Sequence, residues 1–307
     1  MNITLRQLSY FKALAKHAHF GRAAEAVHVS QPALSVQIRE LETTLGAALV
    51  ERGPRRVVLT AFGRTVLAQT DKVLAEMQVM QDMARWKGGL AGDLRLGLIP
   101  TVAPYLLPGA LAAIRARDIG LNVQVEEAKT ARLLDDLFAG RLDAAVIALP
   151  ADAPGLVELP LFEDRFLLAG SPARLQAMDP AARNLTPEDL GRTPLMLLED
   201  GHCLTDQALA VCGRGREHAL INMGASSLAT LSRLVAAGFG LTLMPELAAG
   251  VEGQGLAMHR FATPEPSRTI GLVRRASSPD DGWFHTLGTL LAETGAEITR
   301  AVRAQPA

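Results

Sequence analysis

Two cysteines carry the most distinctive chemistry in this sequence, and they are the only two among its 307 residues. Cys203 and Cys212 stand nine positions apart, and residues 204–211 between them contain neither glycine nor proline, which predicts a helix. Nine helical residues rise about 13.5 Å, whereas a disulfide requires Cα atoms within roughly 7 Å. The two thiols are therefore either never bridged, or bridged only when this helix unwinds, in which case the segment is a switch.

A reactive thiol at Cys203 needs its thiolate to be stabilised, and the predicted helix begins there. Gly201 allows a turn, His202 is adjacent, and free N–H groups of a first helical turn favour negative charge. Asp206 lies about one helical turn after Cys203. It either accepts hydrogen bonds from backbone N–H groups as a cap or repels the thiolate, and the sequence is compatible with both roles. Such a pair suits peroxide chemistry, in which one thiol becomes a sulfenic acid and the second condenses with it. The alternative is a pair of inert core cysteines.

Length and charge divide the chain into a small basic head and a larger acidic body. A chain of 307 residues is expected to form two or three compact units. The overall charge of −1 combines +4 in residues 1–60 with −5 in the rest, so a polyanionic partner is expected for the head alone. No apolar run approaches the roughly 18 residues of a membrane span, and the start lacks a signal-peptide pattern. We therefore expect a cytoplasmic protein without a membrane partner.

Residues 1–60 have the pattern of a winged helix-turn-helix. A short helix over 21–27 and a turn precede a helix from about 31 to 44, which Ser30 can cap and Pro32 can begin. In such motifs the second helix enters the major groove of double-stranded DNA. The alternative is a three-helix bundle whose polar face meets only solvent. The side chains expected to contact DNA, including two arginines of a following β wing, are Gln31, Pro32, Ser35, Arg39, Arg55 and Arg56.

Residues 61–89 predict a long linker helix. Apolar or small residues recur at spacings of four and three from Val66 to Ala84, which indicates a seam for a partner helix. We expect a homodimer through this seam, because a two-fold protein suits a two-fold operator. Packing of the helix against its own head is the alternative.

Residues 90–307 alternate short strands with helices, which predicts a parallel sheet with helices on both faces. A late strand over 269–273 and a final helix over 283–302 are expected to return to the first sheet. The fold class is therefore α/β, with a regulatory domain of two subdomains that face each other across a ligand-binding cleft, as in periplasmic binding proteins. Subdomain I spans about 90–163 and 269–307, and subdomain II about 164–268.

Several stretches resemble a known family. Residues 20–26 (FGRAAEA), 29–35 (VSQPALS) and 38–46 (IRELETTLG) are similar to the N-terminal domain of LysR-type transcriptional regulators. Residues 97–108 (GLIPTVAPYLLP) and 265–273 (EPSRTIGLV), together with 197–209 (LLEDGHCLTDQAL) and Cys212, resemble the OxyR-type branch of that family, which senses hydrogen peroxide.

The resemblance implies a mechanism and a set of partners. Cys203 would be the peroxidatic residue and Cys212 the resolving one, and no cofactor or metal would be needed. The protein would be a regulator rather than an enzyme, a homotetramer built from dimers that controls antioxidant genes as activator or repressor. It would contact RNA polymerase when oxidised and be reduced by a thioredoxin or glutaredoxin system. The residues implied to surround the peroxide are Thr101, Thr130, His202, Asp206 and Arg268.

Two other functions fit parts of the sequence. One is a LysR-type regulator whose cleft binds a small metabolite and whose cysteines are structural. The other is a thiol peroxidase that carries a DNA-binding head. Within the implied site, Thr101 could merely cap the helix that follows it, and Arg268, at the start of a strand, could lie on the surface.

Overall fold

The computed structural model describes residues 3–53, 57–85, 92–117, 121–178, 185–190, 193, 195–213, 221–280 and 282–304. Contacts divide the chain into two compact units, an N-terminal one that ends near residue 84 and a larger C-terminal one. The elements of the N-terminal unit are α1 (Leu5–His17), α2 (Phe20–Ala26), α3 (Gln31–Leu45), β1 (Val50–Arg52), β2 (Val57–Leu59) and α4 (Ala61–Arg85).

Helices α1 to α3 form the predicted helix-turn-helix around one small core. Ser30 Oγ accepts a hydrogen bond from the Ala33 N–H at the start of α3, and Pro32 occupies the first turn. The helix ends at Gly46, whose φ of 75° is the left-handed conformation that favours glycine. The buried side chains that join the three helices include Phe11, Leu14, Ala24, Leu34, Ile38 and Leu41.

The wing and the linker helix follow the core. Strands β1 and β2 pair antiparallel, and the loop that carries Arg55 and Arg56 lies outside the described residues. Thr60 Oγ1 accepts a hydrogen bond from the Gly63 N–H at 2.8 Å and so helps to begin α4. Along α4, Val73 is 45% exposed and Met80 is 71% exposed. These two side chains are available to a second copy, whereas Val66 and Thr70 of the same seam pack within the N-terminal unit. The dimer remains a prediction.

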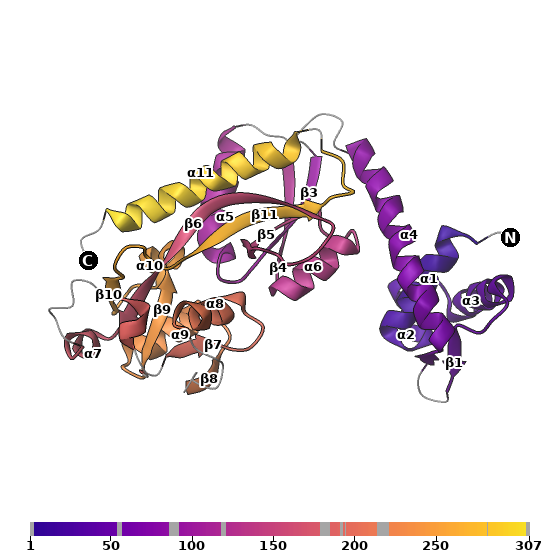
Figure 1. The fold of residues 1–307 in the computed structure, drawn as a ribbon. Coiled ribbons are helices and arrows are strands. Elements are labelled where there is room, and N and C mark those ends of the chain that lie inside the picture. Colours follow the sequence, from indigo (N-terminus) through magenta and orange to yellow (C-terminus); the bar gives the residue numbers. More distant parts are fainter. Residues whose placement is uncertain are drawn as a thin grey trace. The chain divides into compact units, whose positions relative to one another are not determined.

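The C-terminal unit contains two sets of strands and helices (Figure 1). Its first set is β3 (Gly92–Leu98), α5 (Ala103–Ala116), β4 (Leu121–Glu127), α6 (Thr130–Phe138), β5 (Ala144–Leu149) and β6 (Leu156–Gly170). The remaining elements are α7 (Pro172–Gln176), η1 (Pro187–Leu190), β7 (Met196–Leu198), α8 (Cys203–Val211), β8 (Ile221–Ala225), α9 (Leu228–Ala236), β9 (Leu241–Pro245), α10 (Glu246–Glu252), β10 (Ala257–Arg260), β11 (Ser267–Arg275) and α11 (Trp283–Arg303).

The main sheet is mixed, so the predicted parallel sheet is only partly correct. Among the described residues its strands lie in the order β10-β6-β11-β5-β3-β4, with β9 also paired to β6. Strands β3, β4 and β5 are parallel, but β6, β9, β10 and β11 pair antiparallel. The mixed pattern arises because β11 lies between β5 and β6 and runs antiparallel to both. The predicted subdomain boundaries fall inside these two strands.

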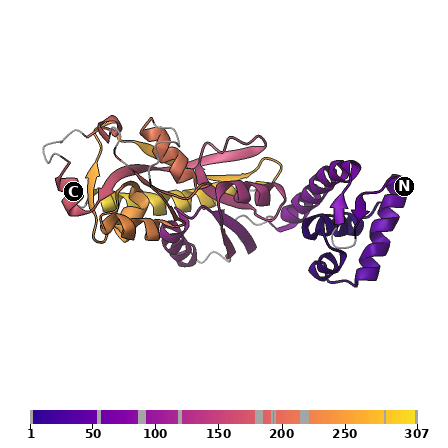
Figure 2. The same cartoon turned by 90° about the horizontal axis from the view of Figure 1, so that it is seen from below.

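Helices cover both faces of the sheet, as predicted. Helix α11 runs along the β6–β11 pair in both views (Figures 1 and 2), and α6 lies on the other side of the sheet. Gly109 and Gly295 allow close packing, because a Cβ would lie 2.8 Å from Thr294 at the first and 2.1 Å from Phe162 at the second. The ends of β3 and β4 lead to Thr101 and Thr130, so both threonines lie at the same edge of the parallel strands.

Candidate functional site

The two cysteines mark the two ends of α8. Cys203 is its first residue and Cys212 is its C-cap, both side chains are half-buried, and no disulfide joins them. The helix predicted between the cysteines is therefore confirmed. Because nine helical residues rise roughly 13.5 Å, the sulfur atoms cannot bond while α8 is intact. Any Cys203–Cys212 disulfide requires α8 to unwind.

The N-terminus of α8 is a suitable place for negative charge at Cys203. The N-cap is His202, with extended backbone angles (φ −84°, ψ 123°), and its side chain makes no capping hydrogen bond. The first-turn N–H groups therefore present the positive end of the helix near the Cys203 sulfur. Thr205 Oγ1 donates to the Leu198 carbonyl at 3.0 Å and ties this turn to β7.

His202 is buried beside a half-exposed ion pair. Burial lowers the pKa of His202, the positive charge of Lys129 lowers it further, and Glu199 opposes both. The imidazole Nε2 lies 3.8 Å from Glu199 Oε1, while Lys129 Nζ donates to that same oxygen at 2.8 Å. The lowered pKa favours the neutral imidazole, in which one ring nitrogen can donate a hydrogen bond while the other accepts one.

Arg268 and Thr101 are joined inside the domain. Arg268 Nη1 donates to Thr101 Oγ1 at 3.0 Å, and Nη2 donates to the Thr101 carbonyl at 3.3 Å. Asp164, on the neighbouring strand β6, accepts from Arg268 Nε at 3.0 Å and from Nη2 at 2.9 Å. Arg268 is 4% exposed and α5 is capped by Val102. The structure therefore favours neither a surface role for Arg268 nor a capping role for Thr101.

Among the described residues, seven side-chain polar atoms are buried without a hydrogen-bond partner, and two of them belong to α6 and α8. These two are the Thr130 hydroxyl, at the first residue of α6, and Gln207 Oε1, one turn after Cys203 on α8. An unmet buried polar atom costs about 1–3 kcal/mol, so each of these two atoms can form a hydrogen bond with a small ligand or a water. Gln207 was not singled out from the sequence, although its i+4 spacing from Cys203 placed it on the same helix face. Asp206, on the same helix, is exposed, and its role at the peroxide remains a prediction.

Helix α3 presents the predicted DNA-contact residues on the side away from its buried stripe. Gln31, Pro32 and Arg39 are exposed, and Ser35 is half-buried. Arg39 Nη2 donates to Ser35 Oγ at 3.3 Å, so the two side chains are close on one face. A helix with this polar outer face has the form that lies in a major groove.

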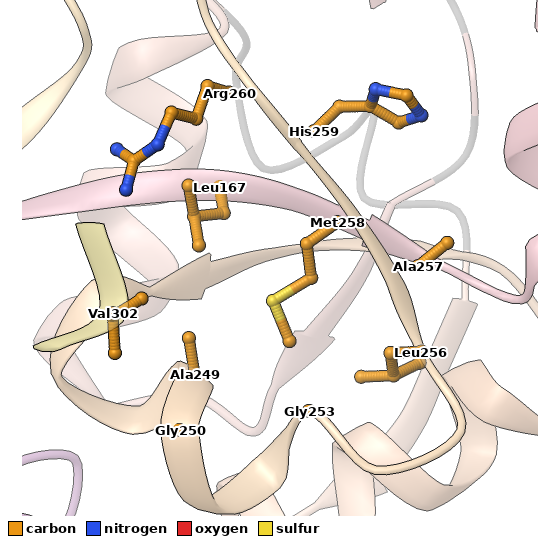
Figure 3. Close-up of a pocket in the computed structure, with 10 residues that line it drawn as sticks. All are labelled: Leu167, Ala249, Gly250, Gly253, Leu256, Ala257, Met258, His259, Arg260 and Val302. Atoms are coloured by element: carbon orange, nitrogen blue, oxygen red, sulfur yellow. The ribbon is translucent and has the colours of Figure 1, made fainter. Parts of the chain in front are cut away.

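A separate hollow of about 430 Å³ lies between α10, β10 and the end of α11 (Figure 3). Met258 and Leu167 point into it, and the other lining residues are mostly small or aliphatic. Its one guanidinium, that of Arg260, is paired with Glu246 at 2.8 Å and Glu265 at 3.4 Å. With the Arg260 charge already paired, we assign no ligand to this hollow.

The described part of the chain contains no helix that is both long and apolar enough to cross a membrane. Within the same residues, no group of three or more His, Cys, Asp or Glu side chains is arranged to hold a metal ion.

Comparison with known proteins places both units in one family. Residues 5–64 match the bacterial regulatory helix-turn-helix protein, lysR family, and residues 87–295 match the LysR substrate binding domain. The Escherichia coli K12 DNA-binding transcriptional dual regulator OxyR is 43% identical over 282 residues, which are 90% of this chain and 91% of that protein. A probable hydrogen peroxide-inducible genes activator of Streptomyces viridosporus is 40% identical, over 98% of this chain and 97% of that protein.

Solved structures of OxyR proteins are also similar. A cysteine-to-serine mutant of Corynebacterium glutamicum OxyR with bound hydrogen peroxide has a TM-score of 0.65 at 35% identity, covering 99% of this chain and 98% of that one. A full-length cysteine-to-aspartate variant of OxyR from Pseudomonas aeruginosa has a TM-score of 0.70 at 34% identity, covering 95% and 97% of the two chains. The chain therefore belongs to the LysR family of transcriptional regulators and, within it, to the OxyR type.

Proposed function

We propose that this protein is a cytoplasmic, promoter-binding regulator that senses hydrogen peroxide by oxidation of Cys203 and then forms a disulfide with Cys212. The observation that carries the proposal is the placement of the two thiols at opposite ends of α8. The first thiol lies at the N-terminus of α8, and the second can be reached only after α8 unwinds. Oxidation is thereby coupled to a change of shape.

The reaction has two steps. The Cys203 thiolate attacks one peroxide oxygen, the O–O bond breaks, and the departing hydroxide takes a proton to become water. Cys212 then attacks the Cys203 sulfenic sulfur, the S–S bond forms, the S–O bond breaks, and a second water leaves. The peroxide accepts two electrons, and the two thiols supply them.

The buried polar groups have roles that suit this chemistry. The Thr130 hydroxyl and Gln207 Oε1 are buried without a partner among the described residues, so each can form a hydrogen bond with a peroxide molecule. Arg268, positioned by Asp164, stabilises the departing hydroxide together with the Thr101 hydroxyl that it contacts. His202 can orient the peroxide or a water, and Asp206 lies on the first turn of α8, close in sequence to Cys203.

Unwinding of α8 changes the surface of the C-terminal unit, and we propose that this change alters a homodimer or homotetramer bound to the promoter. Its oxidised form then contacts RNA polymerase, and a thioredoxin or glutaredoxin system restores the thiols. Support for the DNA-binding part comes from the exposed face of α3 and from the match of residues 5–64 to the regulatory helix-turn-helix.

Thiol titration of the full-length protein tests the proposal. Stoichiometric hydrogen peroxide should remove two thiols from the wild type, whereas Cys203→Ser should keep its remaining thiol. A DNase footprint of one operator should differ between the reduced and oxidised wild type and should not differ for Cys203→Ser. If neither the thiol count nor the footprint changes, the proposal of a peroxide sensor is wrong, and a LysR-type regulator that responds to a metabolite is the remaining candidate. Sustained peroxide turnover with thioredoxin would instead identify a thiol peroxidase.

A further inference from the structure

Lys129 connects two parts of the C-terminal unit that are distant in sequence. It precedes α6, and its Nζ donates hydrogen bonds to Glu199 Oε1 and to the Asp200 carbonyl, both at 2.8 Å. Glu199 and Asp200 belong to the loop between β7 and α8, which leads directly into Cys203. One side chain thus fastens the start of α6 to the loop that begins the redox helix.

The stem of Lys129 also packs against this loop. Gly201 has a φ of 88°, which L side chains rarely adopt, and a Cβ at this position would lie 3.2 Å from Lys129 Cδ. The aliphatic part of Lys129 and its ammonium group are therefore both engaged by residues 199–201. Such double engagement fixes the side chain more firmly than an isolated surface ion pair.

Lys129 also acts on the groups around Cys203. Its hydrogen bond and its charge hold the pKa of Glu199 below the usual range. The same charge lowers the pKa of His202, although burial of the imidazole is the larger cause. The residue that follows it, Thr130, carries one of the buried hydroxyls of the candidate peroxide site. The connection therefore lies at the edge of the site and outside the reacting groups.

We propose that Lys129 is a positioning residue that latches the 199–201 loop to α6 in the thiol state and must release this loop when α8 unwinds. The inference rests on the proposed function, because it concerns the second step, in which Cys212 displaces water from the Cys203 sulfenic acid. The latch opposes that step, since Glu199 and Asp200 adjoin the helix that has to open. Lys129 thus sets how readily a sulfenic acid becomes the disulfide.

The expected effect is modest. The side chains of Lys129 and Glu199 are 37% and 41% exposed, so solvent screens their attraction. Loss of the latch should accelerate disulfide formation about threefold, which corresponds to about 0.65 kcal/mol at the barrier. Screening also predicts that added salt accelerates this step in the wild type.

Rapid-quench kinetics of the full-length protein with hydrogen peroxide test the latch. Sulfenic acid is trapped with dimedone and disulfide is counted by mass spectrometry, so that the second, peroxide-independent step has its own rate constant. Lys129→Gln and Glu199→Gln should each raise that constant about threefold, and Lys129→Arg should restore the wild-type value, because its guanidinium can donate to both acceptors. Salt should accelerate the wild type and leave Lys129→Gln unchanged.

The matched control is Arg117→Gln, which removes an exposed ion pair at 2.6 Å between Arg117 and Glu293, away from α8. It should leave the second step at the wild-type rate. The latch is wrong if wild-type protein forms the disulfide but Lys129→Gln and Glu199→Gln do so no faster, or if Arg117→Gln accelerates it equally. Should Lys129→Gln not fold, Glu199→Gln and the wild-type salt dependence decide. If the wild type forms no disulfide, the proposed function itself fails, and the latch fails with it.

Discussion

Replacing Arg268 by glutamine should be among the most damaging single changes in the C-terminal unit. The guanidinium is 4% exposed, and it is held by Asp164 at 2.9 Å and by the Thr101 hydroxyl at 3.0 Å. Asp164 is fully buried, and its other partner is the Leu247 N–H at 2.8 Å. The change to glutamine leaves this carboxylate buried without its counter-charge, so the variant loses stability as well as reactivity.

The size of the effect follows from the burial of the pair. Breaking a buried ion pair from one side costs about 3–5 kcal/mol. For a unit of this size each kcal/mol lowers the Tm by about 2–4 °C, which gives a decrease of roughly 6–20 °C. Burial already raises the pKa of Asp164 against the opposing charge of Arg268, and removal of Arg268 raises it further.

The stability lost in Arg268→Gln should depend on pH in a definite direction. A carboxyl whose folded pKa is raised binds its proton more tightly in the folded state, so its contribution is favourable below the unfolded pKa and is lost as pH rises. The deficit of Arg268→Gln should therefore shrink as the pH is lowered from 8 toward 5. The unfolding free energy of the wild type, measured at each pH, separates this trend from the general effect of acid on stability.

Urea unfolding, followed by the fluorescence to which buried Trp283 contributes, measures these quantities. Asp164→Asn is the partner variant, and Asp164→Asn with Arg268→Gln removes both charges. The double variant should lose less stability than the two single losses added together, because neither charge is then left alone. An Arg268→Gln deficit below about 1 kcal/mol, or strictly additive losses, would refute the reasoning.

Two further predictions concern other parts of the molecule. Burial lowers the pKa of His202, so just below pH 6.5 the unfolded chain binds more protons than the folded one, and stability falls as the pH falls through that range. His202→Asn should flatten this pH dependence of the unfolding free energy in urea titrations between pH 7 and 5. An unchanged slope would contradict this prediction. Arg39→Ala should weaken operator binding uniformly across sequences and reduce the slope of log K against log salt concentration by about 1. The control variant Arg117→Ala should leave that slope unchanged. A loss confined to one base position would instead indicate that Arg39 contacts a base directly.

The elements nearest the two sites could be predicted from the sequence because their signals are local. Ser30 and Pro32 mark the start of α3, and an uninterrupted run between Cys203 and Cys212 marks α8. The direction of β6 and β11 could not be predicted, since alternation of side chains is the same for parallel and antiparallel strands. Their pairing depends on contacts between segments more than 100 residues apart.

The hydrogen-bond and ion-pair partners of the candidate site residues also could not be predicted from the neighbouring sequence. Asp164 lies 104 positions from Arg268, and Lys129 lies 70 positions from Glu199, so nothing in the neighbouring sequence marks either pair. The unmet oxygen of Gln207 likewise becomes visible only when the packing around α8 is known. The sequence therefore singled out candidate site residues, but it did not predict which side chains hold them in place.

Helix α8 is well suited to a reversible change because its stability comes from packing. Isolated helices shorter than about 12–15 residues are marginal in water, and α8 has nine. The buried side chains of Leu204, Ala208 and Leu209 hold it against the core, and Thr205 ties its first turn to Leu198. The free energy needed to unwind such a helix is set by a few contacts. A covalent bond between its two ends can offset that free energy. In the mechanism that we propose, the separation of the cysteines that prevents a disulfide in the thiol state is therefore what would convert oxidation at Cys203 into movement of the segment.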